Sequence, residues 1–310
     1  MTECERIINK GILPKDFQNA EIICDYYVST EQKKTWIVIY DLLLEFDRIC
    51  REHGLRYTLA FGSLLGVVRH NGFIPWDDDI DVCMPRADYE KLIELKSSFS
   101  EPYFLQIPGK DNDYWYSFIK LRNSNTSAVN RTFRYAEFNQ GHFLDIFPLD
   151  NCLPDEIEEN AAKIKVLLQE NSANMRRSNP YPSDADRQRL TLFNERQPLL
   201  VQSEIEHIAR KYENEDCEWC TTAVMTIYKP NQLTFRKSDI FNTQEVCLYG
   251  HNIPIPNNYD IILKSTYGDY MKYPPVEKRG IWHSDFVFNS DRSYKEILSK
   301  LREEDRLLYI

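Results

Sequence analysis

Apolar residues recur at intervals of three and four along the segment 31–53, which is the spacing of one face of an α-helix. Ser29 and Gln32 stand three positions apart at its start, as in a capping box, and Gly54 follows its end. The pattern therefore predicts one amphipathic helix over 31–53. We assign no firm element to residues 1–28, where polarity is mixed.

The residues that follow alternate between strand-like and helical patterns. Runs rich in β-branched and aromatic residues predict short strands at 56–61, 80–84, 103–107, 118–121 and 143–147. Helical spacing predicts helices at 64–70 and 88–99. This mixture predicts an α+β fold whose core, a mixed sheet with flanking helices, covers residues 31–150.

The second half of the chain has longer helical patterns. They predict helices at 156–171, 187–212, 258–267 and 293–308, the first capped by Asp155 and the second open to interruption at Pro198. Short strands are expected around 233–256. We therefore expect an N-terminal segment (1–30), the core (31–150) and a mostly helical extension (151–310) that packs on the core and completes its site.

Composition and charge narrow the class of protein. The chain has 310 residues, of which 42% are hydrophobic, enough to bury a large core. Its 38 Lys and Arg face 48 Asp and Glu, a net charge of −10, which argues against a nucleic-acid partner because such a partner requires a basic footprint. We find no transmembrane segment and no signal peptide. The 8 cysteines are scattered, so we expect a cytoplasmic protein with reduced thiols.

The feature that carries chemistry is a run of acidic residues at 77–81. Asp79 and Asp81 are two positions apart, so on a strand both carboxylates point to the same face. Neighbouring carboxylates repel each other unless a cation lies between them, and ligands that are all oxygen favour Mg²⁺ or Mn²⁺. Asp145, between two apolar residues of another predicted strand, would join them if the strands are neighbours. This is the arrangement of a phosphoryl-transfer site.

A bare acidic run is most often a solvated loop, but this one follows Phe-Ile-Pro-Trp and leads into a strand. Gly62 and Ser63 offer a turn and a helix N-terminus that can hold a phosphate. Asp77 and Asp78 are expected to cap the strand or to orient the metal ligands. The pattern Gly-Ser, Asp-x-Asp and one more Asp resembles the DNA polymerase beta-like nucleotidyltransferase superfamily. That resemblance implies a short mixed sheet with flanking helices and three metal-binding acids.

A longer set of motifs lies in order along the chain, at 62–66, 68–70, 72–81, 118–123, 144–150, 267–271, 274–275 and His283. This set is similar to the LicD family, the phosphocholine transferases of bacterial surface glycans. Fukutin and fukutin-related protein, which transfer ribitol phosphate, are distant relatives of that family. Little is recognised at 151–256, so the acceptor stays unidentified.

The resemblance implies a CDP-activated alcohol as donor, CDP-choline being the commonest, and a glycan hydroxyl as acceptor. The hydroxyl attacks the phosphorus that carries choline, and CMP leaves. Asp79 and Asp81 would hold Mg²⁺ (or Mn²⁺) against the diphosphate, and Asp145 would complete the metal site or accept the proton of the acceptor. A lipid-linked acceptor would bring this cytoplasmic protein to the inner face of the membrane.

Further residues are expected to bind the donor. Arg69, Lys120 and Arg122 are candidate partners of the diphosphate, although isolated Arg and Lys are usually surface charges. His283 is the histidine that the resemblance favours, whereas a lone histidine is more often structural. Together with Gly62, Ser63 and Asp78, these residues complete the expected donor site.

A choline head group would require an aromatic cage, because a quaternary ammonium donates no hydrogen bond. Trp76 is the best-placed aromatic residue; the other candidates are Tyr114, Trp115, Tyr116 and Trp282. A CDP-polyol donor would require no cage. The lone CxxC formed by Cys217 and Cys220 has no further zinc ligands at a convincing spacing, so we expect ordinary buried cysteines.

Two other functions use the same residues. A true nucleotidyltransferase would move NMP from an NTP to an acceptor and release pyrophosphate, but the extended block at 73–79 argues against it. A non-catalytic glycan-binding protein could keep a relic of the fold. Relics commonly lose metal ligands, however, and here every acid that the motif requires is present.

Overall fold

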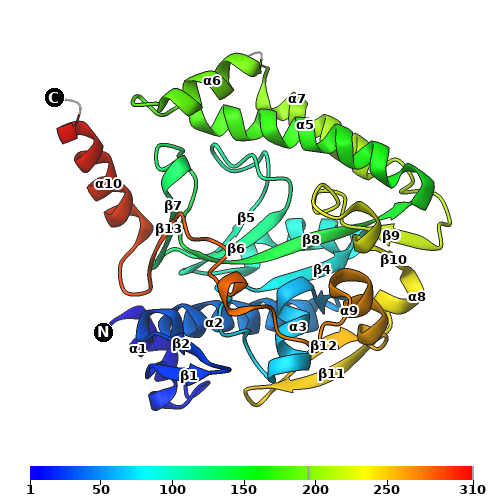
Figure 1. Ribbon diagram of the computed structural model, residues 1–310, viewed down its shortest axis with the longest axis horizontal. Helices are drawn as coiled ribbons and strands as arrows, with labels where there is room; N and C mark the ends of the chain where they lie inside the picture. Colours follow the sequence, from blue (N-terminus) through cyan, green and yellow to red (C-terminus); the bar gives the residue numbers. More distant parts are fainter. Residues whose placement is uncertain (194–195, 309–310) are drawn as a thin grey trace.

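The computed structural model describes residues 1–193 and 196–308, and its centre is a seven-stranded mixed sheet (Figure 1). Five strands run in the order β10-β9-β8-β4-β3, and β5 and β6 extend the sheet from β8. Their bounds are β3 (Thr58–Leu59), β4 (Asp81–Pro85), β5 (Tyr103–Gln106), β6 (Ile119–Asn123), β8 (His142–Cys152), β9 (Trp219–Thr221) and β10 (Thr234–Arg236).

Strand β8 is the spine of this sheet. It pairs in parallel with β4 and antiparallel with β6 and β9, so three other strands depend on its register. Ten of its 11 residues are buried, as expected for a strand covered on both faces. Its apolar side chains fix the register, and the register in turn brings the polar side chains of β4, β6 and β8 to common positions.

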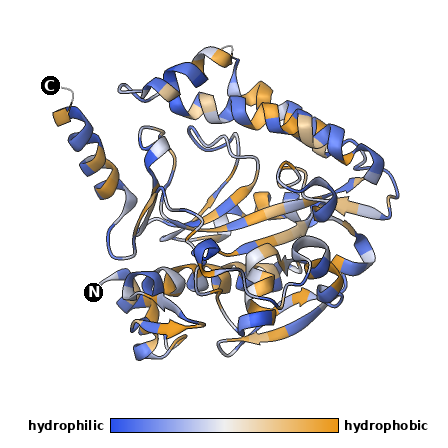
Figure 2. Ribbon diagram, in the orientation of Figure 1, coloured by the Kyte–Doolittle hydropathy of each residue, from blue (hydrophilic) through white to orange (hydrophobic). Residues whose placement is uncertain are grey.

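Helices cover the sheet on two sides in Figure 1. On one side lie α2 (Thr30–His53), α3 (Phe61–His70) and α9 (Tyr259–Tyr267); on the other lie α5 (Ile157–Arg176), α6 (Asp184–Leu192) and α7 (Pro198–Ala209). Shorter or peripheral helices are α1 (Glu3–Ile8), α4 (Arg86–Glu94), α8 (Lys237–Ile240) and α10 (Tyr294–Leu308). The hydropathy view shows apolar residues concentrated along the central strands, which is the core that these layers bury (Figure 2).

Three two-stranded sheets complete the fold: β1 (Glu21–Ile23) with β2 (Tyr26–Val28), β11 (Thr243–Leu248) with β12 (His251–Pro256), and β7 (Ser127–Asn130) with β13 (Phe286–Asn289). The last pair matters for function. By pairing with β7, β13 anchors the C-terminal end of the segment 268–285, which thereby passes the edge of the core.

Most expected elements are confirmed. The helix expected at 31–53 is α2, with the Gln32 amide donating to Ser29 Oγ (3.2 Å) and Gly54 in the left-handed conformation (φ 64°). The strands expected at 80–84, 103–107, 118–121 and 143–147 are β4, β5, β6 and β8, and the expected closing helices are α9 and α10. An α+β fold with a mixed sheet is therefore confirmed.

Several boundaries differ. The strand expected at 56–61 ends at Leu59, because Phe61 adopts a positive φ of 44° and begins α3. Asp155 is not a helix cap, since it lies in a 3-10 turn at Pro154–Glu156 that runs into α5. The helix expected at 187–212 is two helices, with Pro198 as the first residue of α7; its residues 194–195 lie outside the described part of the chain.

The second half carries helices α5 to α10 and also strands β9 to β13. The expected boundary at residue 150 falls inside β8, and β9 and β10 belong to the central sheet. The division into an N-terminal segment, a core and an extension that completes the site stays a prediction. None of the described helices combines the length and the apolar composition that a bilayer crossing requires.

Candidate active site

The acidic run lies in a loop that α2 holds in place. The indole Nε1 of Trp36 donates to the carbonyl of Asp77 (2.8 Å), and the Gln32 side chain donates to the carbonyl of Pro75 (2.6 Å). A capping box also requires the Gln32 side chain to bond back to the start of its own helix. That part of the prediction is wrong, because the Gln32 side chain bonds to the acidic loop instead. Buried donors on a rigid helix thus hold the loop at its base.

Asp81 and Asp145 lie directly opposite each other in the parallel pairing of β4 and β8. Lys120 lies opposite Asp145 on the other side, in the antiparallel pairing of β6 and β8. Its Nζ is 2.5 Å from Oδ1 of Asp145, and both side chains are buried. The sheet register thus brings Asp81, Asp145 and Lys120 into one row across three strands.

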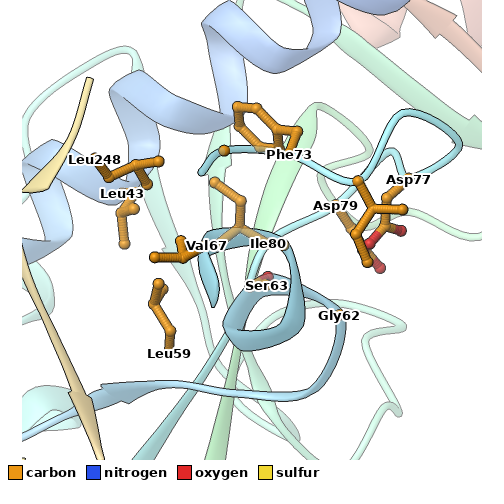
Figure 3. A pocket seen from close by; sticks show the side chains of 13 residues that line it. Leu43, Leu59, Gly62, Ser63, Val67, Phe73, Asp77, Asp79, Ile80 and Leu248 are labelled. Atoms are coloured by element: carbon orange, nitrogen blue, oxygen red, sulfur yellow. The ribbon is translucent and has the colours of Figure 1, made fainter. Parts of the chain in front are cut away.

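The first turn of α3 lies against the same acids. Ser63 Oγ accepts a hydrogen bond from the amide of Asp81 (2.8 Å), which ties α3 to β4. A Cβ atom at Gly62 would lie 2.6 Å from Oδ2 of Asp77, so only glycine allows this carboxylate to approach the turn. Figure 3 shows the carboxylates of Asp77 and Asp79 together beside Gly62, at one end of a narrow and otherwise largely apolar cavity.

The charges in this site are strongly coupled. Burial, together with the charges of Asp81 and Asp78, raises the pKa of Asp77 to about 7. Burial also raises the pKa of Asp79 and of Asp81 well above the ordinary value, and the neighbouring carboxylates add to the effect. Such a group of acids holds its charge poorly without a cation.

His283 closes the site from the C-terminal segment. Its Nδ1 lies 2.9 Å from Oδ1 of Asp78 and 3.8 Å from Oδ2 of Asp79. Burial alone would lower the pKa of His283, but the hydrogen bond to Asp78 and the charge of Asp79 outweigh it and leave this pKa raised. The expected site residue His283 therefore lies among the acids, more than two hundred positions further along the chain.

A divalent cation fits these residues. Oδ2 of Asp78 is buried and has no hydrogen-bond partner among the described residues. A buried carboxylate oxygen without a partner carries a desolvation cost that a cation would remove. Since the carboxylates of Asp77, Asp79 and Asp81 all have raised pKa values, the site has donors and excess negative charge for one.

The expected cationic residues take different positions. Lys120 lies in the site, with its Nζ 3.6 Å from the centroid of the Phe143 ring. Arg122 is buried two residues further on and donates to Gln106 Oε1 (2.6 Å) and to the carbonyl of Gly141 (2.8 Å). Its role toward a diphosphate stays a prediction.

Arg69 contacts the C-terminal segment. Its guanidinium donates to the carbonyl of Tyr270 (2.7 Å) and lies over the ring of Tyr273. In this position it fastens the segment that carries His283 to α3. Diphosphate binding by Arg69 likewise stays a prediction.

The aromatic candidates for a choline cage are not gathered in one place. Trp76 is buried, with its ring beside Tyr26 and Tyr273 and the Arg279 guanidinium 5.0 Å from its centroid. Trp282 is 76% exposed. The others pack in a separate cluster with Phe133 and Phe138, namely Tyr114, Trp115 and Tyr116.

Two aromatic residues near the acids were not among the expected site residues. Tyr267, the last residue of α9, has a pKa that is raised by desolvation and by the charges of Asp81, Asp77 and Asp79. Phe143 packs on both Lys120 and His283. The sequence held a signal for Tyr267, since this residue opens the motif block at 267–271, whereas Phe143 resembles any core residue of a strand.

The cysteines behave as ordinary thiols. All eight are free, and Cys217 and Cys220 are buried. Among the described residues, the one group of three or more acid, cysteine or histidine side chains that brings ligand atoms within 4.8 Å of one another is Asp78, Asp79 and His283. The described part of the chain therefore offers no zinc site at the CxxC.

Comparisons with known proteins agree with this geometry. Residues 54–178 match the family model described as LicD/FKTN/FKRP, nucleotidyltransferase domain. The chain is 27% identical over 259 residues to "Lipopolysaccharide cholinephosphotransferase LicD" of Haemophilus influenzae, across 80% of this chain and 94% of that protein. Uncharacterized proteins of Rickettsia prowazekii and Rickettsia typhi are 31% and 34% identical over 68 and 69 residues, which is 26% and 22% of their own lengths.

The matched domain contains the acidic loop, Lys120 and Asp145, and the longer alignment covers most of both chains. On these grounds the chain is similar to the LicD family, by its matched nucleotidyltransferase domain and by the longer alignment.

Proposed function

We propose that this protein transfers phosphocholine, or a related alcohol phosphate, from a CDP-activated donor to a hydroxyl of a cell-surface glycan and releases CMP. The observation that carries the proposal is the set of acids on and beside the neighbouring interior strands β4 and β8, in a chain that aligns with almost the whole of a lipopolysaccharide cholinephosphotransferase. The acceptor glycan and the alcohol are the finer parts of the proposal.

The reaction forms one bond and breaks one. The hydroxyl oxygen of the acceptor bonds to the phosphorus that carries the alcohol, the bond from that phosphorus to the CMP oxygen breaks, and the hydroxyl proton passes to a base. In this proposal Asp145, which is paired with Lys120, would serve as that base or as an additional metal ligand. Lys120 adds positive charge beside the place where phosphate oxygens would lie.

The crowded acids support magnesium dependence as part of this proposal. Asp79 and Asp81 would hold the ion, which would neutralise the charge that develops on the departing CMP. Ser63 ties the first turn of α3 to Asp81 at the start of β4, and Gly62 leaves room for the Asp77 carboxylate.

A thermal-shift panel tests the proposal without knowledge of the acceptor. The ligands are CDP-choline, CDP-ribitol, CDP-glycerol, CTP and CMP, each with Mg²⁺ or with EDTA. A ligand at 100 times its Kd stabilises the folded state by about 2.7 kcal/mol, so the expected rise in Tm is several degrees. The Asp79→Ala variant is the test variant, and Asp155→Asn, an exposed aspartate outside the site, is its matched control.

The expected result is a Mg²⁺-dependent shift with CDP-choline that Asp79→Ala abolishes and Asp155→Asn retains. A larger shift with CDP-ribitol or CDP-glycerol would replace choline by that alcohol in the proposal and leave the proposed reaction unchanged. A shift with CTP alone would contradict the proposal and favour nucleotidyl transfer, for which pyrophosphate would be the product.

A further inference from the structure

We propose that Asp78, Asp79 and His283 form a divalent-cation site with a nitrogen ligand, which selects a transition ion such as Mn²⁺ over Mg²⁺. The inference deepens the proposed function at the same site. Its test needs no donor and no acceptor, so its failure can be told apart from failure of the proposed function.

The distances within the cluster suit shared coordination. Nδ1 of His283 is 2.9 Å from Oδ1 of Asp78 and 3.8 Å from Oδ2 of Asp79. Adjacent ligands of a six-coordinate ion with bonds of about 2.1 Å lie roughly 3 Å apart. One ion could therefore contact one atom of each residue after small side-chain movements.

A second observation points to a ligand independently of this clustering. The Asp78 side chain is only 3% exposed, and its Oδ2 has no partner among residues 1–193 and 196–308. Buried polar atoms are almost always satisfied, so an unpaired carboxylate oxygen needs a specific explanation. A bound cation would explain the unpaired oxygen, because the cation would be the missing partner of the Asp78 carboxylate.

The histidine is held in position for this role. Its ring packs against Phe143 and Phe286, with centroid distances of 5.4 and 4.8 Å, and its side chain is 16% exposed. Phe286 belongs to β13, which is anchored on β7. The nitrogen is thus presented to the acids by packed aromatic rings rather than by a free loop.

Asp145, the third aspartate that the sequence predicted as a metal ligand, already has another partner. Oδ1 of Asp145 already binds Nζ of Lys120, and both side chains are buried. An ion that bound Asp145 would have to compete with this ammonium group. Asp79 belongs to both sets, so an ion at His283 would lie beside the position expected for the donor diphosphate.

The ligand chemistry predicts the choice of ion. Carboxylates suit Mg²⁺ and Mn²⁺, whereas imidazole suits transition ions, and affinity at an N/O site rises from Mn²⁺ along the first row. Mg²⁺ prefers oxygen and keeps its waters. An ion binds imidazole through a nitrogen lone pair, so the site requires His283 with Nδ1 unprotonated.

The test is electron spin-echo envelope modulation of the whole protein loaded with substoichiometric Mn²⁺, which detects a directly bound nitrogen. The variant is His283→Gln, which keeps a hydrogen-bond donor for Asp78. The matched control is His53→Gln, the same exchange at an exposed position at the end of α2. Isothermal titration with Mn²⁺ and with Mg²⁺ gives the two affinities for each protein.

We expect ¹⁴N modulation in the wild type and in His53→Gln but not in His283→Gln. The Mn²⁺ affinity should fall about tenfold or more in His283→Gln, with a smaller change for Mg²⁺. Wild-type Mn²⁺ bound without ¹⁴N modulation would overturn the proposal and make His283 a positioning partner of Asp78. Absence of Mn²⁺ binding would overturn it as well. If His283→Gln fails to fold, the wild-type spectrum decides alone.

Discussion

Nδ1 of His283 and Oδ1 of Asp78 lie 2.9 Å apart although 205 positions separate them in the chain. This contact joins the C-terminal segment to the acidic loop, and Arg69 fastens the same segment to α3. The site is therefore assembled from segments that lie far apart in the chain. A change in the last strand β13 can reach the acids without touching them.

Replacing Asp81 with Asn should weaken donor binding. The variant keeps the size of the side chain but removes one of the two carboxylates expected to hold the metal against the diphosphate. We expect the Kd for CDP-choline in Mg²⁺ to rise at least about tenfold, measured by isothermal titration. Asp155→Asn should leave it unchanged, and equal affinity in Asp81→Asn would remove Asp81 from the metal site.

Lys120→Met should destabilise the fold strongly. It leaves the buried Asp145 carboxylate without its cation, and breaking a buried pair costs about 3–5 kcal/mol in the free energy of unfolding. The double variant Lys120→Met with Asp145→Leu removes both charges and should recover most of that loss while remaining inactive. Urea unfolding measures the free energy of unfolding of the wild type, the single variant and the double variant. Lys110→Met, at an exposed position, is the control. A double variant as unstable as the single one would contradict this reasoning.

Gly62→Ala should separate the acids from the first turn of α3. The added Cβ would lie 2.6 Å from Oδ2 of Asp77, so the carboxylate must move. We expect a loss of Mg²⁺-dependent donor binding in the thermal-shift assay, with the far-ultraviolet circular dichroism unchanged. Gly280→Ala, where the new Cβ meets nothing within 4 Å, is the control and should bind donor normally.

Asp77→Asn should stabilise the metal-free protein more at pH 8 than at pH 5. The pKa of Asp77 is raised to about 7, so its protonated form favours folding and this contribution is lost as pH rises from the unfolded value of 3.8 through 7. Asn mimics the protonated form and avoids the loss. Urea unfolding in EDTA at the two pH values measures the difference. A gain from Asp77→Asn that is the same at both pH values would show that ionisation of Asp77 is not the cause.

Local patterns in the sequence determined much of the fold. The apolar periodicity, Ser29 and Gly54 defined α2, and apolar runs located β4 and β8, because these signals act over a few residues. The same kind of local signal marked Asp79, Asp81 and Asp145, since acids between apolar residues on strands are conspicuous. The sequence by itself thus indicated the family resemblance, the sheet and the acids.

Only the tertiary structure decided which side chains meet. The opposition of Asp81 and Asp145 depends on the register of two strands about sixty positions apart. The pairing of Lys120 with Asp145, and of His283 with Asp78, depends on long-range packing of β6 and β13. Sequence periodicity carries no information on such contacts, because they arise when distant apolar faces are buried together. For the same reason a residue such as Gln32, whose spacing favours a helix cap, turned out to support the acidic loop.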